Sequence, residues 1–144
     1  IINNKNNNND DCLLMACNNC NNKLIKKLLD LGSNINSKNH EGQTSIILTI
    51  LNNNFECFET LINNENIDLN YCDNYGKTPL MYSFDLIING SNFKDDCRFL
   101  FKLFDHPKIN LNYINHIGHN ILFYIILNKY GKCYNKIINE SNTY

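Results

Sequence analysis

The sequence predicts an all-α solenoid in which short helix–turn–helix units stack side by side. The main observation is a repeated motif: Thr78-Pro79-Leu80-Met81-Tyr82-Ser83 recurs in weaker form 34 residues upstream at Thr44, a further 33 upstream at Asp11, and 42 downstream at Asn120. The second is an apolar stripe of helical period that follows the motif. A period of about 33 residues is typical of stacked repeats, because one unit is too small to bury its own core. We therefore expect a chain built as a binding surface.

Length and charge exclude several classes of protein. The 144 residues fit one domain. Net charge is −1 and 19% of the residues are charged, so we expect binding neither to nucleic acid nor to an anionic membrane. No run approaches the roughly 18 apolar residues that span a bilayer, and no signal peptide is visible.

Cysteine usage indicates the compartment. The seven cysteines are odd in number and lie on apolar helical stripes, whereas a disulfide scaffold in a short secreted chain normally has an even set. We interpret them as reduced thiols of an intracellular, cytoplasmic protein.

Asparagine makes up 31 of the 144 residues. Because Asn, Ile, Lys and Tyr have A+T-rich codons, we interpret this bias as genome composition and not as function. Residues 1–10 are nearly all Asn, Lys and Asp, and they bury too little apolar area to offset the ordering of their backbone. They are predicted to form a disordered, Asn-rich lead-in.

Each repeat is expected to contain two helices. The first begins at a residue whose side-chain oxygen caps a helix (Asp11, Thr44, Thr78 or Asn120), and Pro79 suits the first helical position. These helices are predicted at roughly 11–18, 44–52, 78–89 and 120–128. The second helices, with stripes such as that of Leu24, Ile25, Leu28 and Leu29, are predicted at roughly 22–31, 55–63, 93–104 and 132–139.

The third repeat is eight residues longer than the second, and the extra residues fall around Asp85 to Phe93. We expect them to extend its first helix as far as Gly90, with Ser91 or Asn92 capping its second helix. Inserts in repeat arrays often lie on the binding side, and a lengthened helix that only packs on its neighbour is the other interpretation.

These residues resemble the ankyrin repeat family. The resemblance rests on the Thr-Pro-Leu opening, a Leu-Leu pair in the second helix, the connector Gly32 to Asn36, and Asn/Asp-x-x-Gly turns at 39–42, 73–76 and 115–118. It implies an ankyrin-type solenoid with short β-hairpin-like turns and repeats at approximately 11–43, 44–77, 78–119 and 120–144, the last truncated. The glycines of these turns are expected at positive φ.

The resemblance also implies a partner-binding surface on the turn tips and on the exposed side of the first helices. The positions that match are Lys38, His40, Glu41, Gln43, Cys72, Asn74, Tyr75, Lys77, Ile114, His116, Ile117 and His119 on the tips, and Asn18, Leu51, Asp85 and Leu127 on the helices. We expect Tyr75, His116 and Ile117 to form the energetic centre, because aromatic anchors dominate interfaces.

Residues with possible chemistry do not form a site. Cys12, Cys17 and Cys20 have an iron–sulfur spacing, but small buried thiols are the ordinary use of Cys in such helices. His116 and His119 have no third zinc ligand near them in the sequence. We expect no catalysis, no cofactor and no metal.

The function expected is recognition of an unknown protein partner by a monomeric array within a longer chain. Two alternatives stay open: a segment that recruits substrates for an attached catalytic or ubiquitin-ligase module, and a structural spacer. Apolar residues such as Ile137 and Ile138 persist in the last repeat, where a terminal repeat has a polar face. We therefore expect further repeats after Tyr144.

Overall fold

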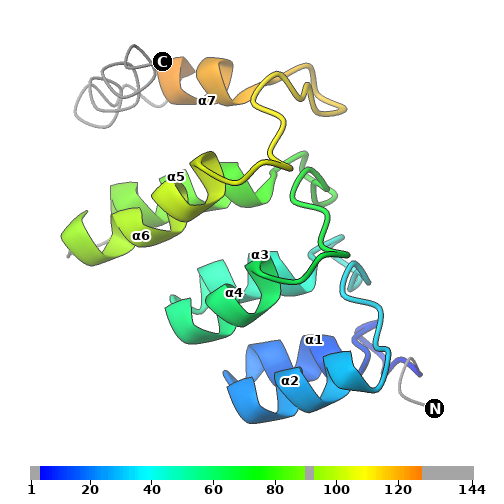
Figure 1. Cartoon of the computed structure of the whole chain (residues 1–144). Helices are drawn as coiled ribbons and strands as arrows, with labels where there is room; N and C mark the ends of the chain where they lie inside the picture. The colour runs from blue at the N-terminus through cyan, green and yellow to red at the C-terminus, as the bar shows by residue number, and fades with distance from the viewer. Residues whose placement is uncertain (1–3, 90–92, 128–144) are drawn as a thin grey trace.

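The computed structural model describes residues 4–89 and 93–127 (Figure 1). Within these ranges the regular elements are seven α-helices: α1 (Cys12–Asn18), α2 (Asn22–Asp30), α3 (Ser45–Leu51), α4 (Phe55–Ile62), α5 (Pro79–Asn89), α6 (Phe93–Phe104) and α7 (Ile121–Leu127). The predicted helices agree with these bounds to within one residue at each end. The eighth, expected at 132–139, lies outside the described residues.

The helices stack in two rows (Figure 1). Helices α1, α3, α5 and α7 contact one another in sequence, and α2, α4 and α6 form the second row. Each of the first three repeats pairs one helix of each row. The segments that join consecutive repeats all project from the same side of the stack (Figure 1). The predicted all-α solenoid is therefore confirmed.

The core lies between the two rows and is continuous through the stack. Its largest fully buried side chains include Phe58, Phe84 and Phe99. Phe99 of α6 packs edge-on against Phe58 and Phe55 of α4, with ring centroids 4.9 and 5.1 Å apart. Each such pair adds about 1 kcal/mol beyond the burial of area, so this aromatic cluster joins the second repeat to the third.

Three of the four predicted helix caps are present. The side-chain oxygens of Asp11, Thr78 and Asn120 accept hydrogen bonds from amides in the first turns of α1, α5 and α7. The prediction is wrong for Thr44, whose hydroxyl is buried without a hydrogen-bond partner. Its backbone instead forms an antiparallel bridge with Lys38, and its hydroxyl does not reach the first-turn amides.

The long third repeat uses its extra residues in both helices. Helix α5 has 11 residues and α6 has 12, whereas α3 has 7 and α4 has 8. Each helix is thus about one turn longer than its counterpart, and the expected extension of the first helix is confirmed. Gly90, Ser91 and Asn92 lie outside the described residues.

Asparagine side chains link the connectors between repeats. The amide of Asn36 donates to the carbonyl of Asn66 at 2.8 Å, and its oxygen accepts from the backbone amide of Asp68 at 2.9 Å. Asn70 makes the same pair of bonds one repeat later, to the connector at 108–110. Each residue satisfies one backbone donor and one acceptor, so it fixes the spacing of two repeats.

No helix among residues 4–89 and 93–127 has the length and apolar character needed to cross a bilayer.

The glycines of the three turns, Gly42, Gly76 and Gly118, have the positive φ values that the sequence predicts. Gly32 in the connector after α2 also has positive φ, and it allows a matched test with Gly42. Gly32 and Gly42 have φ of +82° and +78°. A Cβ atom at Gly42 would lie 2.5 Å from Oδ1 and 2.8 Å from the backbone nitrogen of Asn74, whereas nothing lies within 4 Å of one at Gly32.

We expect Gly32→Ala to lower the free energy of unfolding by about 1 kcal/mol, because only its left-handed backbone is strained. Gly42→Ala should lower it by about 1–3 kcal/mol more, through the contact with Asn74. Urea unfolding of both variants measures the difference. Equal losses would contradict the close approach of the two turns.

Candidate functional site

The turns between repeats are built around one side-chain oxygen each. Oδ1 of Asp73 accepts from the backbone amides of Tyr75 and Lys77 at 2.9 and 2.8 Å, while the amide of Gly76 donates to the Asp73 carbonyl at 3.1 Å. Asn39 and Asn115 make the equivalent bonds in the turns at 39–43 and 115–119. We call these segments tips.

The Asn-rich lead-in forms another tip of the same kind. Oδ1 of Asn6 accepts from the amides of Asn8 and Asp10, both at 2.9 Å. Asn9 takes the place of the turn glycine with φ +61°, a conformation that Asn tolerates better than most residues. The structure corrects the expectation of disorder for residues 4–10, because side-chain hydrogen bonds order this segment without burial of much apolar area. We number the tips from one (6–10) to four (115–119).

The first three tips are bonded to each other through the backbone, and the Asn115 side-chain amide of tip four donates to the Gly76 carbonyl of tip three. The amide of His40 donates to the carbonyl of Asn8 at 3.1 Å, and one repeat later the amide of Asn74 donates to the carbonyl of Glu41 at 2.9 Å. The Asn74 side chain adds a bond to the His40 carbonyl at 2.7 Å. Together with the α1–α3–α5–α7 row, the tips form a continuous surface, which we call the tip face.

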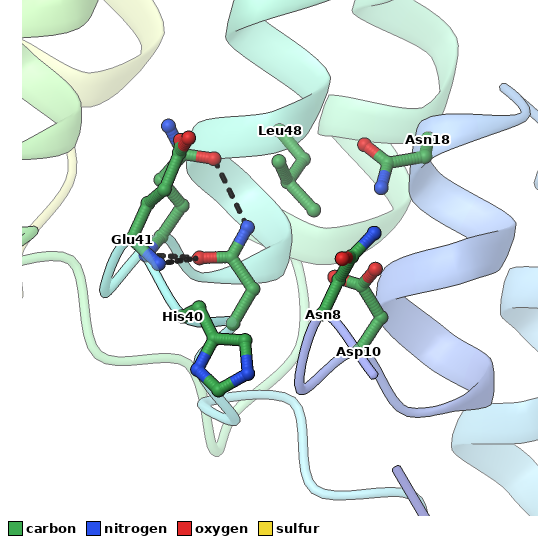
Figure 2. Close-up of a pocket in the computed structure, with 8 residues that line it drawn as sticks. Asn8, Asp10, Asn18, His40, Glu41 and Leu48 are labelled. Carbon is green, nitrogen blue, oxygen red and sulfur yellow. Dashed lines mark hydrogen bonds between the residues drawn. The ribbon is translucent and has the colours of Figure 1, made fainter. Parts of the chain in front are cut away.

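The first groove of the tip face lies between tips one and two and has a volume of about 310 Å³. In Figure 2, Asn8 and Asp10 of tip one and Asn18 at the end of α1 lie on one side of it, His40 and Glu41 lie across from them, and Leu48 of α3 lies behind. Both Asp10 and Gln43 line this groove, and both side chains are almost fully buried.

The second groove also measures about 310 Å³ and lies between α3 and the third repeat. Its walls are the apolar side chains of Leu51 and Leu86 and the polar side chains of Lys77, Tyr82 and Asp85. The ammonium of Lys77 is 2.6 Å from Oδ2 of Asp85 and 5.4 Å from the centre of the Tyr82 ring. The cation of this groove is thus paired with a carboxylate that lines the same groove.

The hydroxyls of Tyr82 and Tyr124 bind two carboxylates in and beside the second groove. The Tyr82 hydroxyl donates to Oδ2 of Asp73 at 2.5 Å, and the Tyr124 hydroxyl donates to Oδ1 of Asp85. Burial raises the pKa of both phenols well above the ordinary value, and the hydrogen bonds to the carboxylates raise it further. Both tyrosines therefore stay neutral donors that orient the two carboxylates.

Several residues predicted to contact a partner are exposed on the tip face. Tyr75, Ile114, Ile117 and Leu51 expose 69%, 63%, 51% and 48% of their surface. The structure also exposes Asn18, His40, Glu41, Asn74 and His116. Exposed apolar side chains of this size on a rigid backbone are typical of interfaces.

The side chains of other predicted contact residues make contacts within the protein. Gln43 lines the first groove but is only 8% exposed, and its side-chain oxygen accepts from the Asn39 side-chain amide at 3.1 Å. Lys38 donates to the Cys72 carbonyl at 3.1 Å and lies over the Tyr71 ring. The ring of His119 packs against that of Phe123 at 4.4 Å.

The side chain of Leu127 lies outside what the structure describes. The predicted contact residues do not include seven residues that line the grooves: Asn8, Asp10, Asn39, Leu48, Ile50, Tyr82 and Leu86. The Asn6-x-x-Asn9 pattern, 33 residues before the Asn39-x-x-Gly42 turn, was the available signal for the first two.

Four thiols of the first two repeats lie in different environments. Cys12 and Cys20 are exposed, whereas Cys17 and Cys57 are buried. Burial raises the pKa of Cys17 far above its ordinary value and that of Cys57 to about 11. Cys72 lies at the surface, with its sulfur 3.6 Å from Nδ1 of His116. No group of three or more His, Cys, Asp or Glu side chains suited to a metal ion is found in the described part of the chain.

Comparison with known families agrees with the repeated structure. Residues 13–112 match the family model described as ankyrin repeats in three copies. No curated protein matches the chain.

Thiol labelling tests the placement of the cysteines. At pH 8 we expect iodoacetamide to alkylate Cys12 and Cys20 at least about tenfold faster than Cys17 and Cys57, because the buried thiols are shielded and poorly ionised. Mass spectrometry of the cysteine peptides measures each rate. In denaturant the four rates should converge, and fast labelling of Cys57 in the native protein would contradict the packing of α4.

Substitutions at two neighbouring residues of tip three distinguish a residue needed for folding from one that is only exposed. Gly76→Val should destabilise the protein by about 2 kcal/mol or more, since φ is +79° and a Cβ atom would crowd the side chains of Asn115 and Ile117 at 3.0 and 3.1 Å. Tyr75→Ala should change stability by about 0.5 kcal/mol or less, because the ring is exposed. Thermal melts decide: if Tyr75→Ala were the more harmful, Tyr75 would be a core residue.

Proposed function

Since the chain belongs to the ankyrin repeat family, whose repeats are in general protein–protein interaction modules without catalysis, we propose that it binds a partner protein across its tip face. The energetic centre of the proposed interface is the exposed apolar surface of tips three and four, around Tyr75, Ile114 and Ile117. The two grooves beside the first helices receive side chains of the partner.

The observation that carries this proposal is the combination of exposure and rigidity on the tip face. Tyr75 is more than two-thirds exposed, yet its own amide is held by Asp73. A side chain presented on a fixed backbone loses little conformational entropy on binding, so more of its contact energy appears as affinity. Aromatic residues in such positions are the commonest hot spots.

The opposite face fits a partner less well. Its groove between α2 and α4 is lined by polar side chains that bond to each other. Nδ2 of Asn22 donates to Glu56 at 2.6 Å, and the Thr60 hydroxyl donates to Oδ1 of Asn22 at 2.7 Å. A partner there would have to displace these bonds, which favours the tip face.

The proposal includes an intracellular location, supported by Cys12, Cys17, Cys20 and Cys57, none of which forms a disulfide. The same surface would serve if the partner is a substrate that the repeats recruit for a catalytic or ubiquitin-ligase module elsewhere in a longer chain.

Affinity capture with matched variants tests the face. The double variant Tyr75→Ser/Ile117→Ser should lose at least about tenfold in the amount of partner captured from a lysate of the source cells, because loss of hot-spot residues reduces affinity by that factor or more. Leu24→Ser/Leu31→Ser is the control, since both leucines are exposed on the second helix row, at 40% and 58%. The proposal fails if the control loses the partners and the tip variant keeps them.

A further inference from the structure

The first groove has a charge that the fold leaves unbalanced. It is lined by the carboxylates of Asp10 and Glu41, and no lysine or arginine of the described residues lines it. Neither carboxylate forms an ion pair within the described part of the chain. The nearby ammonium groups of Lys5 and Lys38 are bonded to the carbonyls of Lys38 and Cys72.

Asp10 is the more informative of the two acids. Only 7% of its surface is exposed, and its carboxylate has a single weak contact among the described residues, from the Asn6 amide to Oδ2 at 3.4 Å. Figure 2 shows this carboxylate on the wall of the groove, on the same side as the amides of Asn8 and Asn18. Because this carboxylate lines an open groove and the protein uses few of its lone pairs, a donor that enters the groove can form charge-assisted hydrogen bonds with it.

In the second groove, the residue at the equivalent tip position supplies a positive charge. Asp10, Gln43 and Lys77 are each the last residue of a tip, and the backbone amide of each donates to the side-chain oxygen of the first residue. They therefore occupy equivalent places in successive tips. In the second groove Lys77 supplies a cation that pairs with Asp85 at 2.6 Å. The first groove has the neutral Gln43 where the second has Lys77, so a cation that pairs with Asp10 or Glu41 has to come from a bound molecule.

We propose that the first groove binds the cationic side chain of an arginine or lysine in the partner, while the second groove takes an apolar side chain from the same segment. This inference rests on the proposed function and names the chemistry of the partner. Helices packed in a row lie roughly 8–10 Å apart, and an extended chain rises about 3.3 Å per residue. The basic and apolar residues are therefore about three positions apart in an extended segment.

Short peptides serve as the probe. Two blocked peptides, acetyl-Arg-Ala-Ala-Leu-amide and acetyl-Leu-Ala-Ala-Arg-amide, cover both chain directions, and the corresponding Glu peptides are the charge controls. In ¹⁵N-correlated NMR spectra, the side-chain amides of Asn8, Asn18 and Gln43 report occupancy of the first groove directly. We expect at least one Arg peptide to shift these signals, the Glu peptides to leave them unchanged, and binding to weaken as salt is raised.

The matched variants are Asp10→Asn, which keeps the shape of the buried residue, and Asp30→Asn, which removes an exposed carboxylate at the end of α2. Asp10→Asn should weaken binding of the Arg peptide about tenfold, and Asp30→Asn should leave it unchanged. Glu41→Gln removes the second carboxylate at an exposed position and leaves the residues of tip one unchanged. It should also weaken binding of the Arg peptide.

Three results would overturn the inference: equal shifts from Arg and Glu peptides, unchanged binding to both acid variants, or larger shifts from calcium chloride alone, which would indicate a metal site. If the peptides fail while capture of a protein still depends on Tyr75 and Ile117, the basic-residue specificity is wrong and the proposed function stands.

Discussion

Each tip depends on a single side-chain oxygen, that of the Asn or Asp in its first position. This oxygen accepts from the amides two and four residues later, as Asp73 does from Tyr75 and Lys77. The turn then needs a residue with positive φ in its fourth position, which Gly76 provides. Without this bond the amides at the tip would lack an internal partner, and the side chains that the tip presents would not be fixed.

The same bonds make the tip face a rigid surface. Because the tips are shaped alike, the carbonyl of one lies where the amide of the next can reach it, as between Glu41 and Asn74 at 2.9 Å. Asn36 and Asn70 repeat this arrangement in the connectors. Hydrogen bonds at the tips, hydrogen bonds in the connectors and the apolar core thus all fix the spacing between repeats.

The scaffold stays constant while the groove chemistry changes along the stack. The residue that closes a tip is an acid at Asp10, a neutral amide at Gln43 and a cation at Lys77, although all three use the same backbone bonds. A tip needs only the amide of this residue, so its side chain is free to vary. Two grooves of equal volume therefore differ in charge, and we connect that difference to the partner they accept.

Local patterns in the sequence were enough for the helices, because apolar periodicity and capping residues act within a few neighbouring positions. The all-α solenoid, the helix bounds and the positive φ of the turn glycines were all predicted in this way. The family resemblance implied the exposed positions of Tyr75, Ile117 and Leu51. The amino-acid composition gave the wrong expectation for residues 4–10. The asparagines interpreted as genome bias include Asn6 and Asn9, which form a tip.

Only the tertiary structure decided which polar side chains stay available to a partner. Gln43 matched the family position for contact, yet its side chain is buried against Asn39, and Lys77 is paired with Asp85. Asp10 was assigned to a disordered segment and instead lines a groove. The contacts of Gln43 with Asn39 and of Lys77 with Asp85 span only four and eight positions, but they form because each tip folds back toward its helix. The first groove depends on bonds between stacked tips, such as that from the His40 amide to the Asn8 carbonyl, and periodicity and capping patterns do not encode which of these side chains meet.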